Sequence, residues 1–371
     1  MASALEAVNN RGPGFDTIRL AAASVVVLHH AMAVEIDIVR DDFLYRFSEG
    51  YTQSGLMAVA VFFSISGFLV TPGLVRSRDV LGYLSRRFMR IMPLLAVVVL
   101  ATALVFGPAL TSLSLREYFA SPQTWLYLKN VTTSLSLELP GVSNHRGSDA
   151  INSPLWTLRF EWLCYLALAA LALIGALARR VLVLCIWGAS QLLLFALFGA
   201  PDVTQAWSQA ETFLYLSGYF GAGVVMYTWS DRIPLARWLL IAAIGALIVA
   251  LYAGIGVFAA PLLVTYLVIA AGMAPLPWSR TLAKADLSYG IYLTHSLVLT
   301  ALLAIFPFTS GIALFASGLA ISALVAFATW TFIERPGLEH KTGPAKFLRT
   351  RFGRMTDRIR KGIAPRPGHR R

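Results

Sequence analysis

An arginine and a histidine stand eleven residues apart in an otherwise apolar segment near the start of the chain. The segment begins at Arg19 and reads RLAAASVVVLHHAMAV. Because an α-helix turns by about 100° per residue, Arg19 and His30 share one helix face, about 16 Å apart. Asp16 lies on the same face, three residues before Arg19, where its carboxylate can hold the guanidinium group.

The cost of ionisable groups in an apolar helix indicates that these residues serve chemistry. A charged side chain in the middle of a bilayer costs about 3 kcal/mol. A neutral histidine can accept a proton from a hydroxyl group, so His30 is our candidate for a general base, with Arg19 as a further catalytic residue. The alternative is a histidine at the membrane interface that only meets lipid headgroups.

Three arginines follow in the segment LSRRFMRIMP. Arg90 stands four residues after Arg86 and three after Arg87, so the three form one surface if the segment is helical. Guanidinium groups suit phosphate, so one interpretation is an anion site at the mouth of a membrane span that Pro93 begins. The alternative is that these arginines only fix the orientation of the span.

A carboxylate lies inside the segment SPLWTLRFEWLCYL. Glu161 falls about 10 Å below the outer surface if this segment is a membrane helix. Arg159 is on the other side of that helix and is no ready partner, whereas His30 lies at a comparable depth. We therefore predict that Glu161 orients and supports His30, as a carboxylate does in many acyl-transfer sites.

Two further segments carry polar side chains inside apolar runs. In FFSISGFLV, Ser66 and Gly67 can permit close helix packing, which we favour over a nucleophilic serine. In LSYGIYLTHSLV, the spacing of Ser288, Tyr292 and His295 places them on one helix face. A stripe of hydrogen bonds between helices is favoured there over direct chemistry.

The composition is that of a polytopic membrane protein. The 371 residues are 57% hydrophobic and only 13% charged, whereas a soluble domain has about 25% charged residues. We predict an all-α bundle of about ten transmembrane helices. The ten spans are expected near residues 17–34, 54–74, 91–107, 156–177, 181–198, 212–229, 237–252, 257–274, 288–306 and 311–332.

The distribution of charge predicts the orientation. The loop over residues 35–53 holds five acidic residues and two arginines, whereas residues 75–90 hold five arginines and one aspartate. Basic residues continue to fall on alternate loops, which places both termini in the cytoplasm and the protein in the cytoplasmic membrane. Pro336 is expected to end the last helix.

The chain is expected to divide into a membrane domain over residues 1–340 and a basic cytoplasmic tail over residues 341–371. From Glu334 onward there are twelve basic and three acidic residues. We favour contact with anionic lipid over nucleic-acid binding for this tail, and expect its end to be disordered.

The two cysteines lie within apolar runs and are expected to pack there, and we predict no metal site.

Six motifs occur in an order that resembles the integral-membrane acyltransferase 3 family. The arginine, ten-residue spacer and histidine of that family select His30, as the helix-face argument does. The resemblance covers about residues 15–336. The residues that carry it are Asp16, Arg19 and His30; Phe62, Phe63, Ser66, Gly67 and Phe68; Arg86, Arg87, Arg90, Ile91 and Pro93; Trp156, Leu158 and Glu161; Ser288, Tyr289, Tyr292 and His295; and Glu334 and Pro336.

This resemblance implies an acyltransferase that uses acyl-CoA, with acetyl-CoA the usual donor among relatives. His30 would be the base, and Arg86, Arg87 and Arg90 would bind the coenzyme A phosphates from the cytoplasm. The pantetheine arm would bridge the distance to His30, where a hydroxyl of a sugar, glycan or small molecule approaches from outside. The residues expected to contact substrate are Ser66, Trp156, Tyr289, Tyr292 and His295.

A multi-span transporter or flippase for a sugar- or lipid-linked substrate is the alternative, because polar residues in a bundle also suit a substrate pathway. Transporters often show repeated halves, and this chain shows no such symmetry. A purely structural scaffold leaves Arg19, His30 and Glu161 unexplained. Acceptor specificity is expected to come from the outer loop over residues 107–155, which includes His145.

Overall fold

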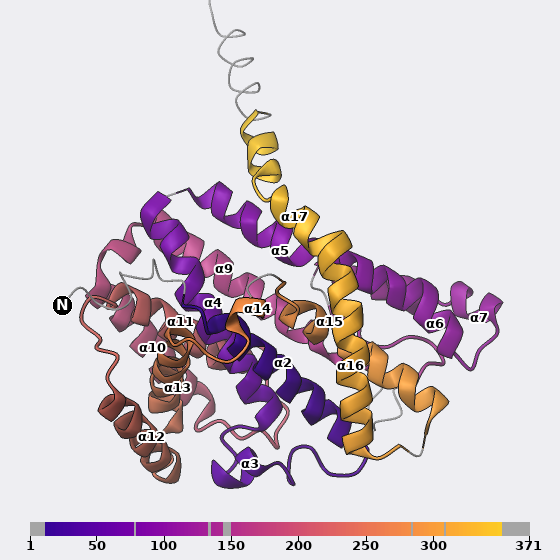
Figure 1. The fold of residues 1–371 in the computed structure, drawn as a ribbon, viewed down its shortest axis with the longest axis horizontal. Coiled ribbons are helices and arrows are strands. Elements are labelled where there is room, and N and C mark those ends of the chain that lie inside the picture. Colours follow the sequence, from indigo (N-terminus) through magenta and orange to yellow (C-terminus); the bar gives the residue numbers. More distant parts are fainter. Residues whose placement is uncertain are drawn as a thin grey trace, which may run out of the picture.

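A computed structural model describes residues 12–77, 79–132, 135–143, 150–282, 285–307 and 309–350. All regular secondary structure in these residues is helical (Figure 1). The long helices are α2 (Phe15–Met32), α4 (Ser54–Ser77), α5 (Val80–Ala101), α9 (Trp156–Leu173), α10 (Arg180–Phe198), α11 (Gln209–Thr228), α12 (Arg237–Tyr252), α13 (Gly256–Met273), α15 (Ser288–Ile305) and α16 (Gly311–Thr329).

Shorter helical segments connect these helices. Some are single turns, and two, η1 and η5, are π-helical. They are α3 (Phe43–Phe47), η1 (Thr102–Phe106), α6 (Gly107–Leu110), α7 (Leu115–Ala120), α8 (Pro122–Leu126), η2 (Tyr127–Thr132), η3 (Ser153–Leu155), η4 (Ala176–Ala178), α14 (Ser279–Leu282), η5 (Trp330–Glu334) and α17 (Arg335–Glu339).

The all-α prediction is confirmed for the described residues, and each of the ten predicted spans overlaps one of the long helices. Within the described ranges, seven helical stretches are long and apolar enough to cross a membrane: those that contain α4, α5, α9, α10, α13, α15 and α16. Helix α12 has only 16 residues, and α2 and α11 do not meet these criteria. The number of ten crossings and the cytoplasmic position of both termini stay predictions.

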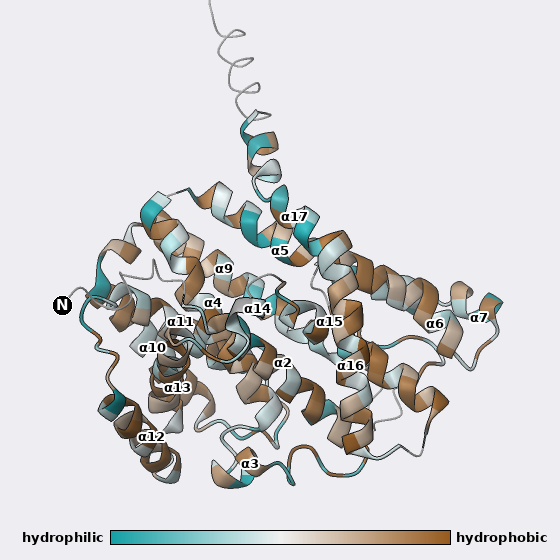
Figure 2. Cartoon of the chain, viewed as in Figure 1, coloured by the Kyte–Doolittle hydropathy of each residue, from teal (hydrophilic) through white to brown (hydrophobic). Residues whose placement is uncertain are grey.

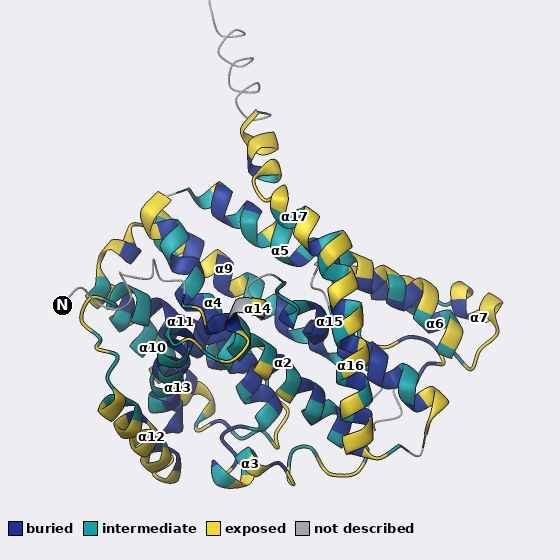
Figure 3. Cartoon of the chain, in the orientation of Figure 1, coloured by how far each residue is buried: buried dark blue, intermediate teal, exposed yellow. Residues whose placement is uncertain are grey.

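The centre of the bundle is formed by α2 and α4, with α11, α13 and α15 packed around them (Figure 1). Helices α4 and α11 approach closely, because a Cβ atom on Gly67 would lie 2.0 Å from the carbonyl oxygen of Phe220. Gly67 is therefore a packing residue, as predicted. Buried side chains concentrate in these central helices, whereas α12 and the C-terminal segment are mostly exposed (Figure 3).

Two predictions about proline are wrong. Helix α5 begins at Val80, where the Asp79 side chain accepts a hydrogen bond from Gly82 N, so Pro93 lies inside the helix. Pro336 does not end the last helix, because it stands in the first turn of α17, where its missing N–H group is tolerated. The π-helical segment η5 joins α16 to α17 directly.

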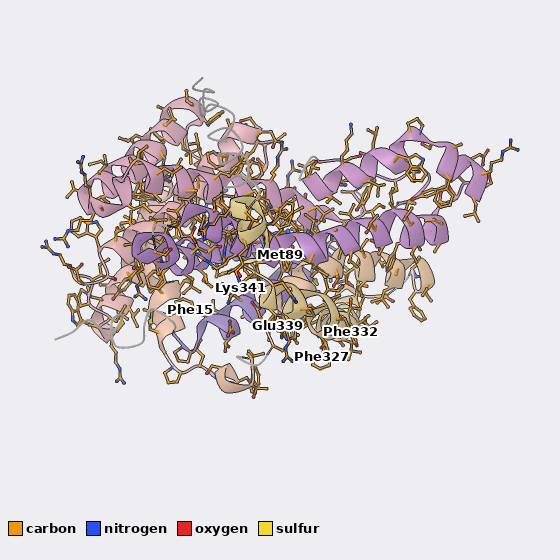
Figure 4. All side chains as sticks on the ribbon, turned by 90° about the horizontal axis from the view of Figure 1, so that it is seen from above. Phe15, Met89, Phe327, Phe332, Glu339 and Lys341 are labelled. Carbon is orange, nitrogen blue, oxygen red and sulfur yellow. The ribbon has the colours of Figure 1, made fainter. Side chains whose placement is uncertain are left out.

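The start of the predicted tail packs against α5. Ser85 Oγ donates to Lys341 O at 2.7 Å and accepts from Ala345 N at 3.3 Å. Figure 4 shows Met89 of α5 beside Glu339 and Lys341 of this segment. Residues 343–350 continue as helix, and the predicted disorder falls on residues outside the described part of the chain.

Candidate active site

Five helices meet at a cavity of about 90 Å³. The lining includes side chains from three predicted groups: the α2 arginine, the α5 arginine cluster and the α15 tyrosines. A cavity of this size holds several water molecules or a short acyl chain, but not a nucleotide. The lining residues discussed below are Arg19, Ser66, Arg87, Arg90, Glu161, Tyr165, Ser288, Tyr289 and Tyr292.

Ion pairs join four segments at one end of this cavity. Asp286, just before α15, lies 2.6 Å from Arg90 Nη2 of α5 and 3.4 Å from Arg19 Nη1 of α2. Arg90 Nη1 lies 2.9 Å from the carboxylate of Glu334 in η5, whose side chain is only 1% exposed. Asp16 lies 3.8 Å from Arg19, which confirms that predicted pair.

Asp286 is the centre of this ion network. Burial alone would raise the pKa of Asp286, but the Arg90 and Arg19 guanidinium groups outweigh burial and hold its pKa below the ordinary value. Ser288 Oγ also donates to Asp286 at 2.6 Å. The carboxylate is thus ionised at neutral pH and fixes the directions of both arginines.

The predicted arginine cluster divides into three different environments. Arg90 is held by two carboxylates and also lies over the ring of Tyr289, with Cζ 5.2 Å from the ring centroid. Arg87 lines the cavity with Cζ 5.8 Å from the Tyr165 ring centroid and, among the described residues, forms no ion pair. Arg86 does not line the cavity, and its guanidinium group lies near Gly82 and Asp79 at the start of α5.

Glu161 lines the cavity but does not pair with His30, so that prediction is wrong. Its carboxylate accepts a short hydrogen bond from Tyr165 OH, on the next turn of α9, and a longer one of 3.5 Å from Ser66 Oγ of α4. Ser66 and Tyr165 are themselves 2.8 Å apart. The predicted pair fails because α9 turns Glu161 toward α4 rather than toward the end of α2.

Among the described residues, a second histidine, His295 of α15, contacts His30. Nδ1 of His295 lies 2.8 Å from Tyr292 O and 3.2 Å from Ile291 O. Carbonyl oxygens only accept, so Nδ1 of His295 carries hydrogen and, in the neutral ring, Nε2 is an acceptor. This Nε2 lies 3.1 Å from Nδ1 of His30, which is also 3.0 Å from Val26 O. His30 therefore carries its hydrogen on Nδ1, and its basic nitrogen in the neutral ring is Nε2.

The segment before α9 brings a hydroxyl group to that nitrogen. Ser153 Oγ lies 3.4 Å from Nε2 of His30. The backbone here is fixed on α15, because Asn152 Nδ2 donates to Leu293 O at 3.0 Å and Ser296 Oγ donates to Ile151 O at 3.1 Å. Ser153 therefore marks the place where a hydroxyl group meets the histidine pair.

Tyr292 connects the cavity to the histidine pair. It lines the cavity, and its ring centroid lies 6.2 Å from that of His295, one turn further along α15. Its hydroxyl group is 2.8 Å from Thr157 Oγ1. The other predicted substrate residues differ in position: Tyr289 lines the cavity and donates to Ile91 O, whereas Trp156 is absent from the lining and packs against Phe160.

Sequence reasoning missed Asp286, Tyr165 and Ser153 as parts of the site. Asp286 had a usable signal, since it is an acidic residue just before a polar helix face that starts at Ser288. Tyr165 stands one helical turn after Glu161, a spacing that predicts contact. His145, part of the outer loop that is expected to set acceptor specificity, lies outside the described residues. Among the residues that are described, no group of three His, Cys, Asp or Glu side chains could hold a metal ion.

Comparison with known families identifies the family of the chain. A family model described as an acyltransferase domain, that of the acyltransferase 3 family, matches residues 13–331. The chain belongs to the acyltransferase 3 family. The matched region contains His30, His295, the α5 arginines and Glu161, and it ends three residues before Glu334.

Two relatives of this acyltransferase 3 chain are known by name. An O-acetyl transferase of Shigella phage Sf6 is 32% identical over 154 residues, which are 41% of this chain and 43% of the relative. The match therefore covers less than half of that relative's length. Nodulation protein 10 of Rhizobium leguminosarum bv. viciae is 26% identical over 305 residues, 76% of this chain and 82% of the relative. No solved structure matches the chain.

Proposed function

We propose that this membrane protein transfers an acyl group from cytoplasmic acyl-CoA to a hydroxyl group of a sugar, a glycan or a glycosylated small molecule. The observation that carries the proposal is that polar side chains extend from the α5 arginines toward the histidine pair. Arg87, Arg90 and Tyr292 line the cavity. Outside this lining, the ring centroid of His295 lies 6.2 Å from that of Tyr292, and its Nε2 lies 3.1 Å from Nδ1 of His30. The cationic end suits a nucleotide, and the histidine end suits proton transfer.

His30 is the general base in this proposal. Nε2 of His30 takes the proton of the acceptor hydroxyl, and the oxygen attacks the thioester carbonyl. The carbon–sulfur bond breaks, and the proton on His30 passes to the departing coenzyme A thiolate. His295 replaces Glu161 as the group that orients His30, because its Nε2 accepts from His30 Nδ1 and leaves the opposite nitrogen facing Ser153.

Only the acyl end of the donor is expected to enter the cavity. A cavity of about 90 Å³ can hold the acyl end of the thioester, whereas the nucleotide must stay at the mouth. Arg87 is the rim arginine that can give both of its terminal nitrogens to a phosphate, since Asp286 and Glu334 occupy those of Arg90. Glu161 keeps Tyr165 and Ser66 oriented on the cavity wall.

The acyl group is proposed to be acetyl, and the membrane to be the cytoplasmic membrane. The name of the phage relative, O-acetyl transferase, supports acetyl transfer to oxygen. The alternating distribution of basic residues supports a cytoplasmic position for the arginine mouth and an outer position for His30. The acceptor would therefore approach from the outer side.

The test uses membranes from cells that express the protein, incubated with radiolabelled acetyl-CoA. We expect labelled ester in the glycan fraction together with free coenzyme A, and a loss of about 100-fold or more in the His30→Gln variant. His340→Gln is the matched control, because His340 is exposed and lies outside the site. Full transfer by His30→Gln, or no ester formation by the unmodified protein, would contradict the proposal. The latter outcome would favour a transporter.

A further inference from the structure

A second, largely apolar groove lies apart from the candidate active site. Its volume is about 560 Å³, and it runs between the end of α11, α12 and the middle of α13. Three of the four α12 side chains that line it are alanines, Ala242, Ala243 and Ala246, which leaves the groove open. A volume of this size is that of a ligand site rather than a packing defect.

The walls of the groove suit hydrocarbon. Leu239, Leu262 and Val225 face it, and polar side chains occur only at one end. Helix α12 is apolar along most of its length and lies at the edge of the bundle (Figures 1 and 2). Apolar cavities stay dry and take apolar ligands, so an acyl chain is the occupant that a membrane offers.

The polar end of the groove is positively charged. Arg232 lines this end together with Trp229, and Arg180 lies above the same indole, with Cζ 4.9 Å from its centroid. One carboxylate, that of Asp231, is shared between Arg180 at 3.1 Å and Arg232 at 3.9 Å. Arg179 and Arg237 add two further positive charges nearby in sequence, so positive charge exceeds negative at this end.

Two hydrogen bonds fix the segments between the charged and the apolar parts of the groove. The linker between α11 and α12 is tied to α13, because Tyr266 OH donates to Pro234 O at 2.9 Å. Trp229 Nε1 donates to Arg180 O at 3.2 Å, which fixes the indole at the mouth. Tryptophan and arginine at the end of an apolar groove are typical of the headgroup level of a bilayer.

We propose that this groove binds an anionic glycerophospholipid, with one acyl chain between α11, α12 and α13 and the phosphate on Arg232 and Arg180. Basic pockets between transmembrane helices on the cytoplasmic side bind such headgroups. The lipid would cover the face of α12 that carries Leu239, Ala242 and Ala246, on a helix that packs mainly on α13. The site is separate from the acyl-transfer machinery and shares no lining residue with it.

The test is native mass spectrometry of the purified protein in detergent, with phosphatidylglycerol and phosphatidylcholine of identical acyl chains added at equal concentration. We expect retention of about one phosphatidylglycerol molecule per chain, in clear excess over phosphatidylcholine. The double variant Arg180→Gln/Arg232→Gln should lower retention of phosphatidylglycerol about tenfold, as expected when two charge-assisted contacts are lost.

A second variant tests the apolar part without changing charge. Ala246→Phe fills the groove and should lower retention of both lipids, while Arg335→Gln, an exposed arginine elsewhere, should leave retention unchanged. Equal retention of the two lipids, retention that neither variant lowers, or a dimer in place of the lipid adduct would overturn the proposal. The acetyl-transfer assay does not enter this test, so either proposal can fail alone.

Discussion

At the scale of single residues, the arrangement of hydrogen bonds decides which nitrogen of His30 is basic. Two backbone carbonyls fix the hydrogen of His295 on Nδ1, and His295 then fixes the hydrogen of His30 in the same way. The histidine pair thus performs the orienting function that sequence reasoning gave to Glu161, whose carboxylate serves Tyr165 and Ser66 instead.

The difference between Arg87 and Arg90 gives a prediction at this scale. Arg87→Gln should raise the KM for acetyl-CoA about 10- to 100-fold, because a charge-assisted contact to phosphate contributes about 1.5–3 kcal/mol, while kcat changes little. Initial rates at varied acetyl-CoA concentration measure both constants.

Arg90→Gln is the comparison, and it should lower the amount of folded protein and kcat together. It leaves Glu334 buried without its ion-pair partner, and Asp286 with Arg19 alone. An unchanged KM in Arg87→Gln would show that the donor phosphates do not bind at this rim.

At the scale of elements, one buried carboxylate ties the C-terminal end of α2 to the N-terminal end of α4. Asp42 accepts from Leu44 N at 2.8 Å and Tyr45 N at 3.2 Å, which caps α3, and from the backbone and hydroxyl of Ser54, the first residue of α4. His29 Nδ1 of α2 lies 3.6 Å from the same carboxylate. The two adjacent histidines on α2 therefore have different roles. His30 belongs to the candidate active site, and His29 belongs to the contact that joins α2 to α4.

Asp42 gives a prediction about pH. Burial would raise the pKa of Asp42, but hydrogen bonds from His29 and Ser54 outweigh it and hold the pKa well below the ordinary value. Because the folded-state pKa is the lower one, ionised Asp42 stabilises the fold fully above the ordinary carboxyl pKa. This contribution is lost only as the pH falls through the folded-state value.

The free energy of unfolding of Asp42→Asn should therefore be about 1–3 kcal/mol lower than that of the unmodified protein at neutral pH. This difference should shrink in acid. Thermal unfolding in detergent across a pH series measures this. Asp41→Asn is the control, since its pair with Arg46 is largely exposed and should matter little. A difference independent of pH would show that the charge of Asp42 is not what stabilises the contact that joins α2 to α4.

The sequence predicted the positions of the helices better than the contacts between them. Hydrophobic runs located ten long helices, and the period of the α-helix placed Arg19 and His30 on one face. Which helices become neighbours depends on how each one rotates about its axis in the bundle, and a single helix does not encode this. Glu161 was therefore paired with the wrong helix, and His295 was not recognised as the partner of His30. Pro93 and Pro336 were misread because a proline can stand inside or at the start of a helix as well as mark its end.

At the scale of the whole molecule, the ion network holds together segments far apart in the sequence. Asp286 contacts Arg19 near the start of the chain and Arg90 in α5, and Arg90 extends the network to Glu334 near the end of the membrane domain. Charges this poorly exposed are costly unless each has a partner. The same contacts that close the bundle therefore also place two guanidinium groups at the cavity.

Removal of the central carboxylate tests this double role. Asp286→Asn should destabilise the protein by about 1–3 kcal/mol, because Arg19 and Arg90 lose a shared partner but keep Asp16 and Glu334, and should lower acetyl transfer as both guanidinium groups lose their direction. Thermal unfolding in detergent and the membrane assay measure the two effects.

Glu339→Gln is the matched control, since the Arg335–Glu339 pair is more than 60% exposed on both sides and such pairs contribute about 0–1 kcal/mol. If the two variants unfold at the same temperature, the network is not what joins the ends of the chain. If Asp286→Asn unfolds early but the folded fraction keeps full activity, the network supports the bundle without positioning the arginines for the donor.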